Sequence, residues 1–344
     1  MKIYNITHSS DIDGLASAAL LAHCYGMPAR NVFFSQPSGK QFEDSVKLIK
    51  RLAGKGNLLV LTDLAMNKSN NKKMAEALSS FKRKGNSIIW LDHHSWDQSS
   101  VNALSKYCDI IVMGELPFCG ADLVYRLLCE KDAVGGELAR IAHFADFAIY
   151  PKRYEKLIWN INYTQKILGT DDRIDSPKLR RLVSLLSMGR YDDRYITSVA
   201  KAYIRRSKPY MDALMKNATA ANVNGVRIAV GFSKKISNQV ACIDMLKRFR
   251  ADVAVYVPTD TGHCSIRCQS RIDRKRMVRV GGVDGARLAR TLGGNGHPLA
   301  SGFAIEVGRG LTEDGIERIR NLIIEKARDV YGNQKVIRRQ RRTR

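Results

Sequence analysis

Acidic residues and histidines follow three short apolar runs in the first hundred residues of this chain. The runs are KIYNIT, LLVLT and SIIWL, and the residues that follow them are His8, Asp11, Asp13, Asp63, Asp92, His93 and His94. Each run is rich in Leu or β-branched residues, which is typical of a buried parallel strand. Ligands of an open α/β sheet gather at the carboxyl ends of its strands, so we expect these side chains in one crevice.

Several carboxylates in one crevice repel one another unless a cation lies among them. Imidazole together with carboxylate ligands suits Mn²⁺, Zn²⁺ or Fe²⁺, whereas an all-oxygen set suits Mg²⁺ or Ca²⁺. The predicted set is too large for one tetrahedral ion and suits two ions about 3.5–4 Å apart that share one carboxylate. Such a pair activates water and holds a phosphoryl group during in-line attack.

Each motif alone has a simpler explanation. An Asp-x-Asp-Gly turn is common as an Asx-turn, and an Asp after an apolar run is often a helix N-cap. A single histidine is more often a hydrogen-bonded polar residue than a metal ligand. The occurrence of all three motifs in this order, each at a strand end, favours the metal site.

The remaining pattern predicts an α/β protein with two domains. Up to residue 150, strands alternate with helices, which indicates a doubly wound, mostly parallel sheet. From about residue 121 to residue 210 the pattern is helical, and a second unit mixes strands and helices from residue 226. We expect a catalytic domain over 1–170, a helical connection over 171–222, a smaller α/β domain with a mixed sheet over 223–332 and a basic tail over 333–344. The stretch 201–223 is predicted to form one long basic helix.

The net charge of +24, from 57 basic and 33 acidic residues, indicates a polyanionic partner, most often nucleic acid. A generally basic protein background is the alternative explanation. The seven cysteines are scattered and form no CxxC motif, which argues against a zinc ribbon or a disulfide framework and favours a cytoplasmic location. We expect no membrane span and no signal peptide, because no apolar run reaches membrane length and the N-terminus leads directly into a strand.

A second motif is the glycine-rich segment GGNGHPLASG, from Gly293 to Gly302. Glycines allow backbone N–H groups to converge on an anion, and His297 adds a donor. A simple turn is the alternative explanation for such a segment.

Together, these motifs resemble the DHH phosphoesterase superfamily. HSSDIDG, the Asp of LVLTD, and DHH are similar to the first three motifs of its catalytic domain. GGNGHPLASG is similar to the GGGHxxAAG signature of the substrate-binding domain that follows in many members, with Asn295 replacing a glycine at a position compatible with a positive φ. Members include RecJ-type exonucleases, short-oligonucleotide nucleases, cyclic-dinucleotide phosphodiesterases and family II pyrophosphatases.

The resemblance implies a site with two Mn²⁺ ions, for which Mg²⁺ or Co²⁺ could substitute. One ion would be held by His8, Asp11 and Asp63, and the other by Asp13, Asp63, His93 and Asp146. Asp146 takes the place of the family's fourth motif, an Asp in a helical stretch after DHH, and Asp109, Asp122 and Asp132 remain alternatives.

The family also implies further roles. The catalytic residues would be Asp63, His93 and His94, with His94 contacting the phosphate and Asp92 hydrogen-bonded to a histidine. The substrate would be bound by Arg267, Gly294, Asn295, Gly296 and His297. The basic stretch after Arg267 would be either a track for the strand or a solvated loop; it consists of Arg271, Arg274, Lys275, Arg276 and Arg279.

The sequence thus predicts a metal-dependent exonuclease that hydrolyses short oligoribonucleotides or single-stranded nucleic acid to mononucleotides. One alternative is a phosphohydrolase of cyclic dinucleotides or of 3′-phosphoadenosine 5′-phosphate. Another is a non-catalytic nucleic-acid-binding replication or RNA factor. The expected partner is short RNA or single-stranded nucleic acid, no membrane partner is expected, and a homodimer is compatible with the sequence. The polarity of attack stays open.

Overall fold

The computed structural model describes all residues except 114–116, 235, 274, 276, 308–309 and 333–344. The chain divides into two compact units, one of residues 1–203 with 274–278 and one of residues 204–273 with 279–344. The expected basic tail lies outside the described residues. The predicted limits of the domains and of the connection stay predictions.

The first unit is built on a five-stranded, fully parallel sheet with strand order β2-β1-β3-β4-β5. Its strands are β1 (Ile3–His8), β2 (Val32–Ser35), β3 (Leu58–Thr62), β4 (Ser87–Asp92) and β5 (Ile110–Met113). The first crossover places β2 on one side of β1, and the next places β3 on the other side. The strand order therefore reverses between β1 and β3, and a crevice forms at such a switch point beyond the carboxyl ends of the strands.

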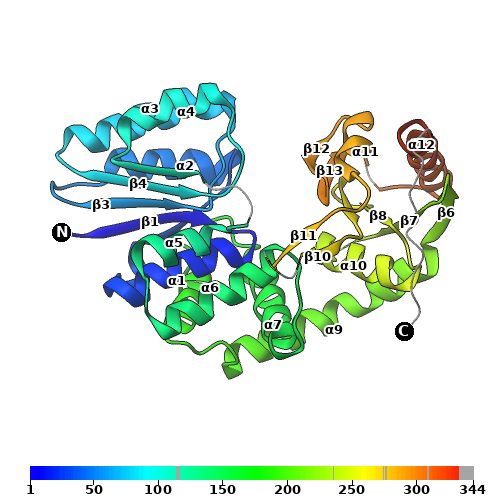
Figure 1. Ribbon diagram of the computed structural model, residues 1–344, viewed down its shortest axis with the longest axis horizontal. Coiled ribbons are helices and arrows are strands. Elements are labelled where there is room, and N and C mark those ends of the chain that lie inside the picture. The colour runs from blue at the N-terminus through cyan, green and yellow to red at the C-terminus, as the bar shows by residue number, and fades with distance from the viewer. Residues whose placement is uncertain (114–116, 235, 274, 276, 308–309, 333–344) are drawn as a thin grey trace. The chain divides into compact units, whose positions relative to one another are not determined.

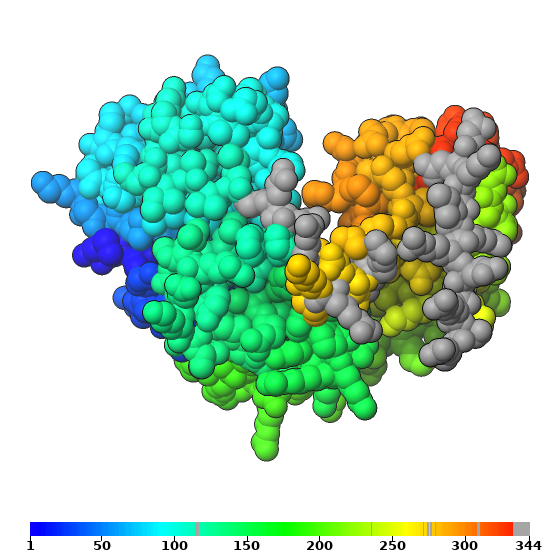
Figure 2. All heavy atoms as spheres, viewed as in Figure 1, coloured from blue at the N-terminus to red at the C-terminus, as the bar shows by residue number. Residues whose placement is uncertain are grey.

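Helices cover both faces of this sheet (Figure 1). One face carries α2 (Gly39–Arg51), α3 (Asn71–Arg83) and α4 (Gln98–Leu104), and the other carries α1 (Ile12–Tyr25), α5 (Gly120–Leu128) and α6 (Ala133–Asp146). Two further helices, α7 (Lys152–Leu168) and α8 (Pro177–Ser187), complete the unit. In Figure 2 the cyan surface of α3 and α4 and the green surface of the later helices form the visible face of this unit.

Burial explains why these segments fold as they do. Apolar side chains of the strands, such as Ile6 and Trp90, pack against Phe42 of α2 and Phe81 of α3. Helix α1 is buried from its first residue through Leu21, since it packs among α5, α6 and α8. Its alanines permit that close approach of neighbouring helices.

The second unit contains a six-stranded mixed sheet of order β12-β13-β9-β8-β7-β6, in which only β7 and β8 are parallel. Its strands are β6 (Thr219–Val223), β7 (Val226–Ser233), β8 (Val253–Pro258), β9 (His263–Cys268), β12 (Asn295–His297) and β13 (Ala300–Ala304). A separate pair is formed by β10 (Arg271–Asp273) and β11 (Val278–Val280). The helices are α10 (Asn238–Arg248), α11 (Gly285–Thr291) and α12 (Glu313–Tyr331).

Alternate residues of β7, β8 and β9 enter one apolar core with α11 and α12, as the period of two in a strand requires. The predicted parallel sheet and the predicted mixed second sheet are confirmed. The prediction of one helix over 201–223 is wrong at its end. The helix α9 (Arg194–Asn217) stops earlier, and Thr219–Val223 forms β6 because it pairs with β7. No helix in the described part of the chain is long and apolar enough to cross a membrane.

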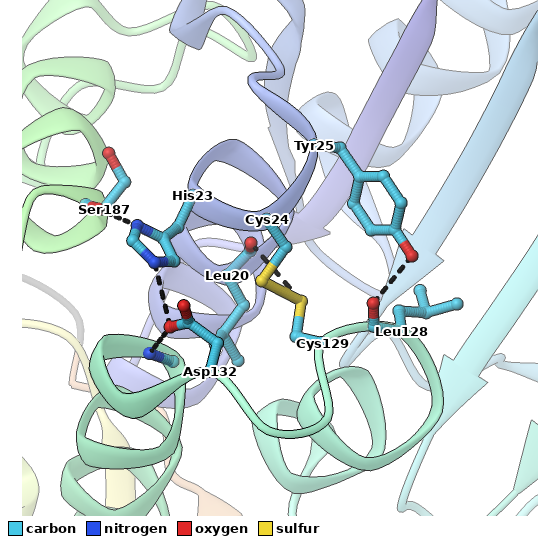
Figure 3. The surroundings of a disulfide bond; sticks show 9 residues. Leu20, His23, Cys24, Tyr25, Leu128, Cys129, Asp132 and Ser187 are labelled. Atoms are coloured by element: carbon cyan, nitrogen blue, oxygen red, sulfur yellow. Dashed lines mark hydrogen bonds and ion pairs between the residues drawn. A yellow bond between two sulfur atoms is a disulfide. The ribbon is translucent and has the colours of Figure 1, made fainter.

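A disulfide joins Cys24, near the end of α1, to Cys129, the residue after α5 (Figure 3). The neighbouring Tyr25 hydroxyl donates a hydrogen bond to the Leu128 carbonyl at 2.7 Å. The scattered cysteines led us to expect no disulfide framework. The structure nevertheless contains this one disulfide among its described residues. Sequence spacing could not reveal it, because folding brings together two residues that are 105 positions apart.

Removing this disulfide should destabilise the first unit. In the double variant C24S/C129S, we expect the free energy of unfolding to fall by about 2–4 kcal/mol, because the unfolded chain regains the entropy of a long loop. Urea denaturation followed by tryptophan fluorescence measures this, since all three tryptophans lie in the first unit. Replacement of the free Cys108 by Ser is the matched control. Equal stability of the oxidised and reduced wild-type proteins would contradict the prediction.

Candidate metal centre

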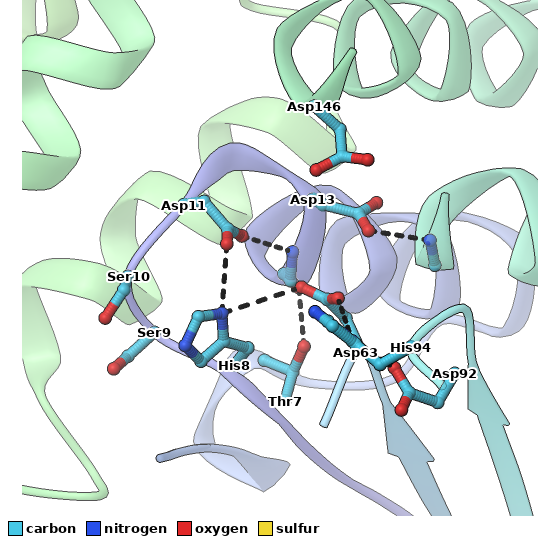
Figure 4. Close-up of polar contacts among 12 residues, drawn as sticks. Thr7, His8, Ser9, Ser10, Asp11, Asp13, Asp63, Asp92, His94 and Asp146 are labelled. Atoms are coloured by element: carbon cyan, nitrogen blue, oxygen red, sulfur yellow. Dashed lines mark hydrogen bonds and ion pairs between the residues drawn. The ribbon is translucent and has the colours of Figure 1, made fainter. Parts of the chain in front are cut away.

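The predicted ligands of the first unit meet at the C-terminal edge of its parallel sheet. His8 ends β1, Asp63 follows β3, and His93 and His94 follow β4. Asp11 and Asp13 lie at the start of α1, and Asp146 is the last residue of α6. Figure 4 shows the side chains of His8, Asp11, Asp13, Asp63, His94 and Asp146 gathered around one space. This space lies at the point where the strand order reverses, as expected for a ligand site in an open sheet.

Asp63 lies at the centre of the cluster and is 1 % exposed. Neither of its carboxylate oxygens has a hydrogen-bond partner among the described residues. Three imidazole nitrogens surround them: Nδ1 of His8 at 3.8 Å, Nε2 of His93 at 3.4 Å and Nδ1 of His94 at 3.8 Å. Burial, together with the neighbouring carboxylates, raises the pKa of Asp63 well above its ordinary value. A buried carboxylate in this state is unfavourable unless a cation binds it.

These residues fit a divalent metal ion. Ligand atoms that share one ion, each about 2.0–2.2 Å from it, lie only a few ångströms apart, as the atoms around Asp63 do. Within this cluster, two groups have their ligand atoms close enough for one ion, namely His8 with Asp11 and Asp63, and Asp63 with His93 and His94. Asp63 belongs to both groups and has two oxygens, so it can bridge two ions. Imidazole nitrogen and carboxylate oxygen are ligands that Mn²⁺, Zn²⁺ and Fe²⁺ accept.

His8 and Asp11 form the first side of the site. His8 Nδ1 lies 3.0 Å from Asp11 Oδ2, and its Nε2 lies 3.2 Å from Oε1 of Gln36. The other Asp11 oxygen accepts the N–H of Gly14 and thereby caps α1. Burial works to raise the pKa of Asp11, but the charge and hydrogen bond of His8 hold it below its ordinary value. Gln36 is oriented in turn, because its amide nitrogen donates to the hydroxyl groups of two serines next to His8, Ser9 and Ser10.

Asp13 is held by the N-terminus of helix α5. Its two oxygens accept the backbone N–H groups of Gly120 at 2.6 Å and Ala121 at 2.7 Å. Each oxygen keeps a second lone pair, and Oδ2 lies 3.7 Å from Nε2 of His93. Burial raises the pKa of Asp13, while His93 opposes that shift. The positive end of the helix dipole and two amide donors thus fix the orientation of this carboxylate.

Gly120 is the residue that permits this contact. A Cβ atom at position 120 would lie 2.8 Å from Cβ of Asp63 and 3.0 Å from Oδ2 of Asp13. Two residues of the centre therefore pack directly against the backbone of α5. These contacts of α5 were not predicted from the sequence, in which their one signal is a glycine at the start of an amphipathic segment.

His93 connects Asp146 to the cluster. Its Nδ1 lies 3.9 Å from Asp146 Oδ2, whereas its Nε2 faces Asp13 and Asp63. Burial, partly offset by His93, raises the pKa of Asp146 to about 6. The alternatives to Asp146 have other partners: Asp109 binds Lys82, Asp122 binds His143, and Asp132 caps α6 and binds His23.

Asp92, which is buried, and His94, which is half-buried, form an ion pair at the rim of the cluster. Asp92 Oδ1 lies 2.8 Å from Nδ1 of His94, and the same carboxylate accepts the backbone N–H of His93 and the indole N–H of Trp96. Burial alone would lower the pKa of His94, but the hydrogen bond to Asp92 raises it to about 9. Asp92 therefore orients the ring of His94, and not that of His93.

The predicted substrate-binding residues lie in the second unit. Arg267 is in β9 opposite Ala300 of β13, and its Nε is buried without a hydrogen-bond partner among the described residues. Asn295 to His297 form β12, which is exposed and pairs with β13. Asn295 does not adopt the positive φ that the sequence allowed, because it is a strand residue opposite Gly302. Gly296 does adopt one, at 137°.

Much of the predicted basic stretch after Arg267 cannot be placed. Arg274 and Arg276 lie outside the described residues, as do the side chains of Arg271 and Arg279. Lys275 is an exposed turn residue, and the role of the stretch as a track for a strand stays a prediction.

The fold and the ligand set define an α/β domain with a cluster of histidines and aspartates that suits metal ions. The profile of the DHH family, N-terminal domain, matches residues 2–149. Residues 2–149 therefore form a DHH-family domain, as the motifs in the sequence indicated. None of the curated proteins matches the chain.

The chain is similar to several solved structures. The pGpG-specific phosphodiesterase PggH from Vibrio cholerae has 13% sequence identity and a TM-score of 0.55, over 95% of this chain and 99% of that chain. An uncharacterized protein from Helicobacter pylori G27 has 16% identity and a TM-score of 0.31, over 97% of this chain and 100% of that chain. A candidate family II inorganic pyrophosphatase from Methanococcus jannaschii has 12% identity and a TM-score of 0.29, over 93% of this chain and 99% of that chain. Of these three structures, the similarity to PggH alone is high enough to indicate a shared fold.

A methyl group at position 120 should weaken metal binding. In Gly120→Ala, the new Cβ must displace Asp63 or Asp13, so we expect the affinity for Mn²⁺ to fall about 10–100-fold, as for other losses of ligand support. Isothermal titration calorimetry of the chelator-treated protein measures this. Gly315→Ala, near the start of α12, is the matched control and should bind Mn²⁺ like the wild type. Unchanged affinity in Gly120→Ala would show that the close packing has no role.

Replacement of Asp63 by Asn should separate stability from metal binding. Asp63 has φ 49°, a conformation that Asn tolerates well, so the backbone should be kept. In the presence of chelator we expect D63N to be more stable than the wild type by about 1–2 kcal/mol, since a buried carboxylate without hydrogen-bond partners among the described residues is removed. Urea denaturation and Mn²⁺ calorimetry test both effects. A variant that is less stable and still binds Mn²⁺ would refute the bridging role.

Proposed function

We propose that this protein is a two-metal phosphodiesterase that releases mononucleotides from short oligoribonucleotides or single-stranded nucleic acid. The observation that carries the proposal is the buried carboxylate of Asp63, which lacks hydrogen-bond partners and lies within 4 Å of three imidazole nitrogens. We further propose Mn²⁺ as the metal, because the ligands mix imidazole and carboxylate. Two bound ions would supply Lewis acidity toward the phosphate and a lowered pKa for the attacking water.

The residues of the chain would then have distinct tasks. Asp63 would hold both ions, with His8 and Asp11 on one side and Asp13, His93 and Asp146 on the other. The imidazolium of His94, kept protonated by Asp92, would donate a hydrogen bond to a phosphate oxygen. Fixed donors of this kind stabilise the charge that develops on the phosphate during the reaction.

The charge distribution supports a polyanionic substrate. The second unit, residues 204–273 with 279–344, contains 26 basic and 12 acidic residues, whereas the longer first unit contains 31 and 21. The second unit is therefore the strongly basic part of the chain, and basic surfaces attract phosphate backbones without reading sequence. We propose that Arg267 and the segment Gly294–His297 bind a nucleotide there. The buried Nε of Arg267 has a hydrogen bond left to donate, and a phosphate or sugar oxygen could accept it.

A dinucleotide is the first substrate to test. The similar structure from Vibrio cholerae is described as specific for pGpG, which is a dinucleotide and thus the shortest substrate of the proposed class. That specificity belongs to the other protein. It indicates that this fold can process the shortest oligoribonucleotides, and a cyclic dinucleotide or 3′-phosphoadenosine 5′-phosphate stays the alternative substrate.

The proposal predicts metal-dependent release of mononucleotides. We expect end-labelled RNA of two to about twenty-five nucleotides to be shortened with Mn²⁺ and left intact with chelator, because two ions are needed for attack and charge stabilisation. Denaturing gel electrophoresis resolves the products, and the position of the label reveals the polarity. The same assay with DNA of equal lengths tests whether the enzyme distinguishes ribose from deoxyribose.

Variants make this assay specific. D63N should lower the turnover number by at least about 10²–10³-fold, since the position of both ions depends on this carboxylate. Asp109→Asn is the matched control, because Asp109 binds Lys82 outside the site and should be dispensable. Metal-loaded protein that cleaves no RNA or DNA of any length would refute the exonuclease and direct attention to small nucleotides. Absence of both cleavage and metal would favour the non-catalytic factor.

A further inference from the structure

The ring of His8 lies between the carboxylates of the metal centre and a polar side chain outside it. Nδ1 of His8 lies 3.0 Å from Asp11 Oδ2 and 3.8 Å from Asp63 Oδ2, as the dashed lines in Figure 4 show. Nε2 of the same ring lies 3.2 Å from Oε1 of Gln36, the residue that directly follows β2. An ion that His8 shares with Asp11 and Asp63 must therefore bind Nδ1, because Nε2 faces Gln36.

This arrangement requires one particular tautomer of His8. A neutral imidazole carries a hydrogen on one ring nitrogen and a lone pair on the other. A metal ion takes the lone pair, so the hydrogen must be on Nε2 and needs an acceptor there. Oε1 of Gln36 is that acceptor. In the other tautomer Nδ1 would donate its hydrogen to Asp11, and it would have no lone pair for the ion.

A network of hydrogen bonds sets the direction in which the Gln36 carboxamide faces. Its Nε2 donates to the hydroxyl oxygens of Ser9 and Ser10, each at 2.6 Å. The Ser9 hydroxyl donates its one hydrogen to Oε1 of Gln41 at 3.1 Å, so its oxygen is an acceptor toward Gln36. Ser9 and Gln41 are 4 % and 9 % exposed, which leaves little room for competing water. The donors thus follow one direction, from His8 to Gln41, and the oxygen of Gln36 is left for His8.

We propose that Gln36 is a positioning residue whose carboxamide oxygen keeps the hydrogen of His8 on Nε2 and leaves Nδ1 for the metal ion. This inference rests on the metal centre of the proposed function and adds a residue outside the motifs that predicted this centre. The sheet fixes where Gln36 begins, because Ser35, the residue before it, pairs with His8 across β1 and β2. The competing explanation is that Gln36 only holds the loop of Ser9 and Ser10 in place.

Two replacements of Gln36 separate these explanations. Gln36→Glu keeps an oxygen acceptor for His8 but loses both N–H donors to the serines, whereas Gln36→Met loses the acceptor and the donors together. Gln98→Leu is the matched control, since Gln98 is an exposed residue of α4 that contacts Asn102. Calorimetry with Mn²⁺ on the chelator-treated proteins measures metal affinity. Long-range proton–nitrogen NMR of the wild type loaded with Zn²⁺, which is diamagnetic, shows which nitrogen of His8 carries the hydrogen.

If Gln36 positions His8, Gln36→Met should lower the affinity for one Mn²⁺ ion about 10–100-fold, as other losses of a hydrogen-bond partner of a ligating histidine do. Gln36→Glu should bind Mn²⁺ at least as tightly as the wild type, Gln98→Leu should be unchanged, and NMR should show hydrogen on Nε2 of His8.

Three results would overturn the inference: equal losses in Gln36→Met and Gln36→Glu, unchanged affinity in Gln36→Met, or metal on Nε2 of His8. None of these measurements requires turnover. A protein that binds Mn²⁺ as expected and cleaves no nucleic acid therefore contradicts the proposed function alone, whereas a wild type that binds no metal overturns both.

Discussion

The arrangement of the metal centre in the first unit depends on the buried carboxylate of Asp63. It lacks hydrogen-bond partners in the described structure, is 1 % exposed and follows its strand with a positive φ of 49°. Neither an unpaired buried charge nor a left-handed backbone stabilises a fold, and each costs on the order of 1–3 kcal/mol. Both features make sense if a cation occupies the space that His8, His93 and His94 surround. The fold is less stable because Asp63 lacks hydrogen bonds, and for the same reason its two oxygens remain available to a metal ion.

The sheet topology places such a residue where it is useful. Because β3 joins the sheet on the opposite side of β1 from β2, the loops after β1 and β3 diverge and leave a crevice. Two helices begin at this crevice, and both direct N–H groups at carboxylates. Asp11 caps α1 through Gly14, and Asp13 is bound by the first two amides of α5. Backbone dipoles thus partly offset the repulsion among the acids before any ion arrives.

The sequence allowed the metal ligands at the strand ends to be predicted. It did not allow prediction of the groups that hold these ligands in place. Parallel strands carry their C-terminal residues to one edge, so His8, Asp63 and His93 were expected together, and the structure brings His8 and His93 within 4 Å of Asp63. The amides of Gly120 and Ala121 act on a residue more than 100 positions away, and a backbone group has no sequence signature. The contact of Gln36 with His8 depends likewise on the pairing of β2 with β1. Strand β6 was not predicted, because a short edge strand forms only through its pairing with a neighbouring strand, here β7.

The two helices that start at the metal centre are also joined at their other ends. Beyond the last turn of α1, Cys24 is bonded to Cys129 after α5, and Tyr25 donates to Leu128. His23 adds an ion pair with Asp132 at 2.9 Å, which links α1 to the start of α6. A helix is stiff along its axis, so fixing the C-terminal ends of α1 and α5 limits how far their N-termini can separate. At the near ends, the first two amides of α5 bind Asp13 of α1, so hydrogen bonds at one end and the covalent link at the other keep the two helices side by side. Asp13 is thereby held in place beside Asp63.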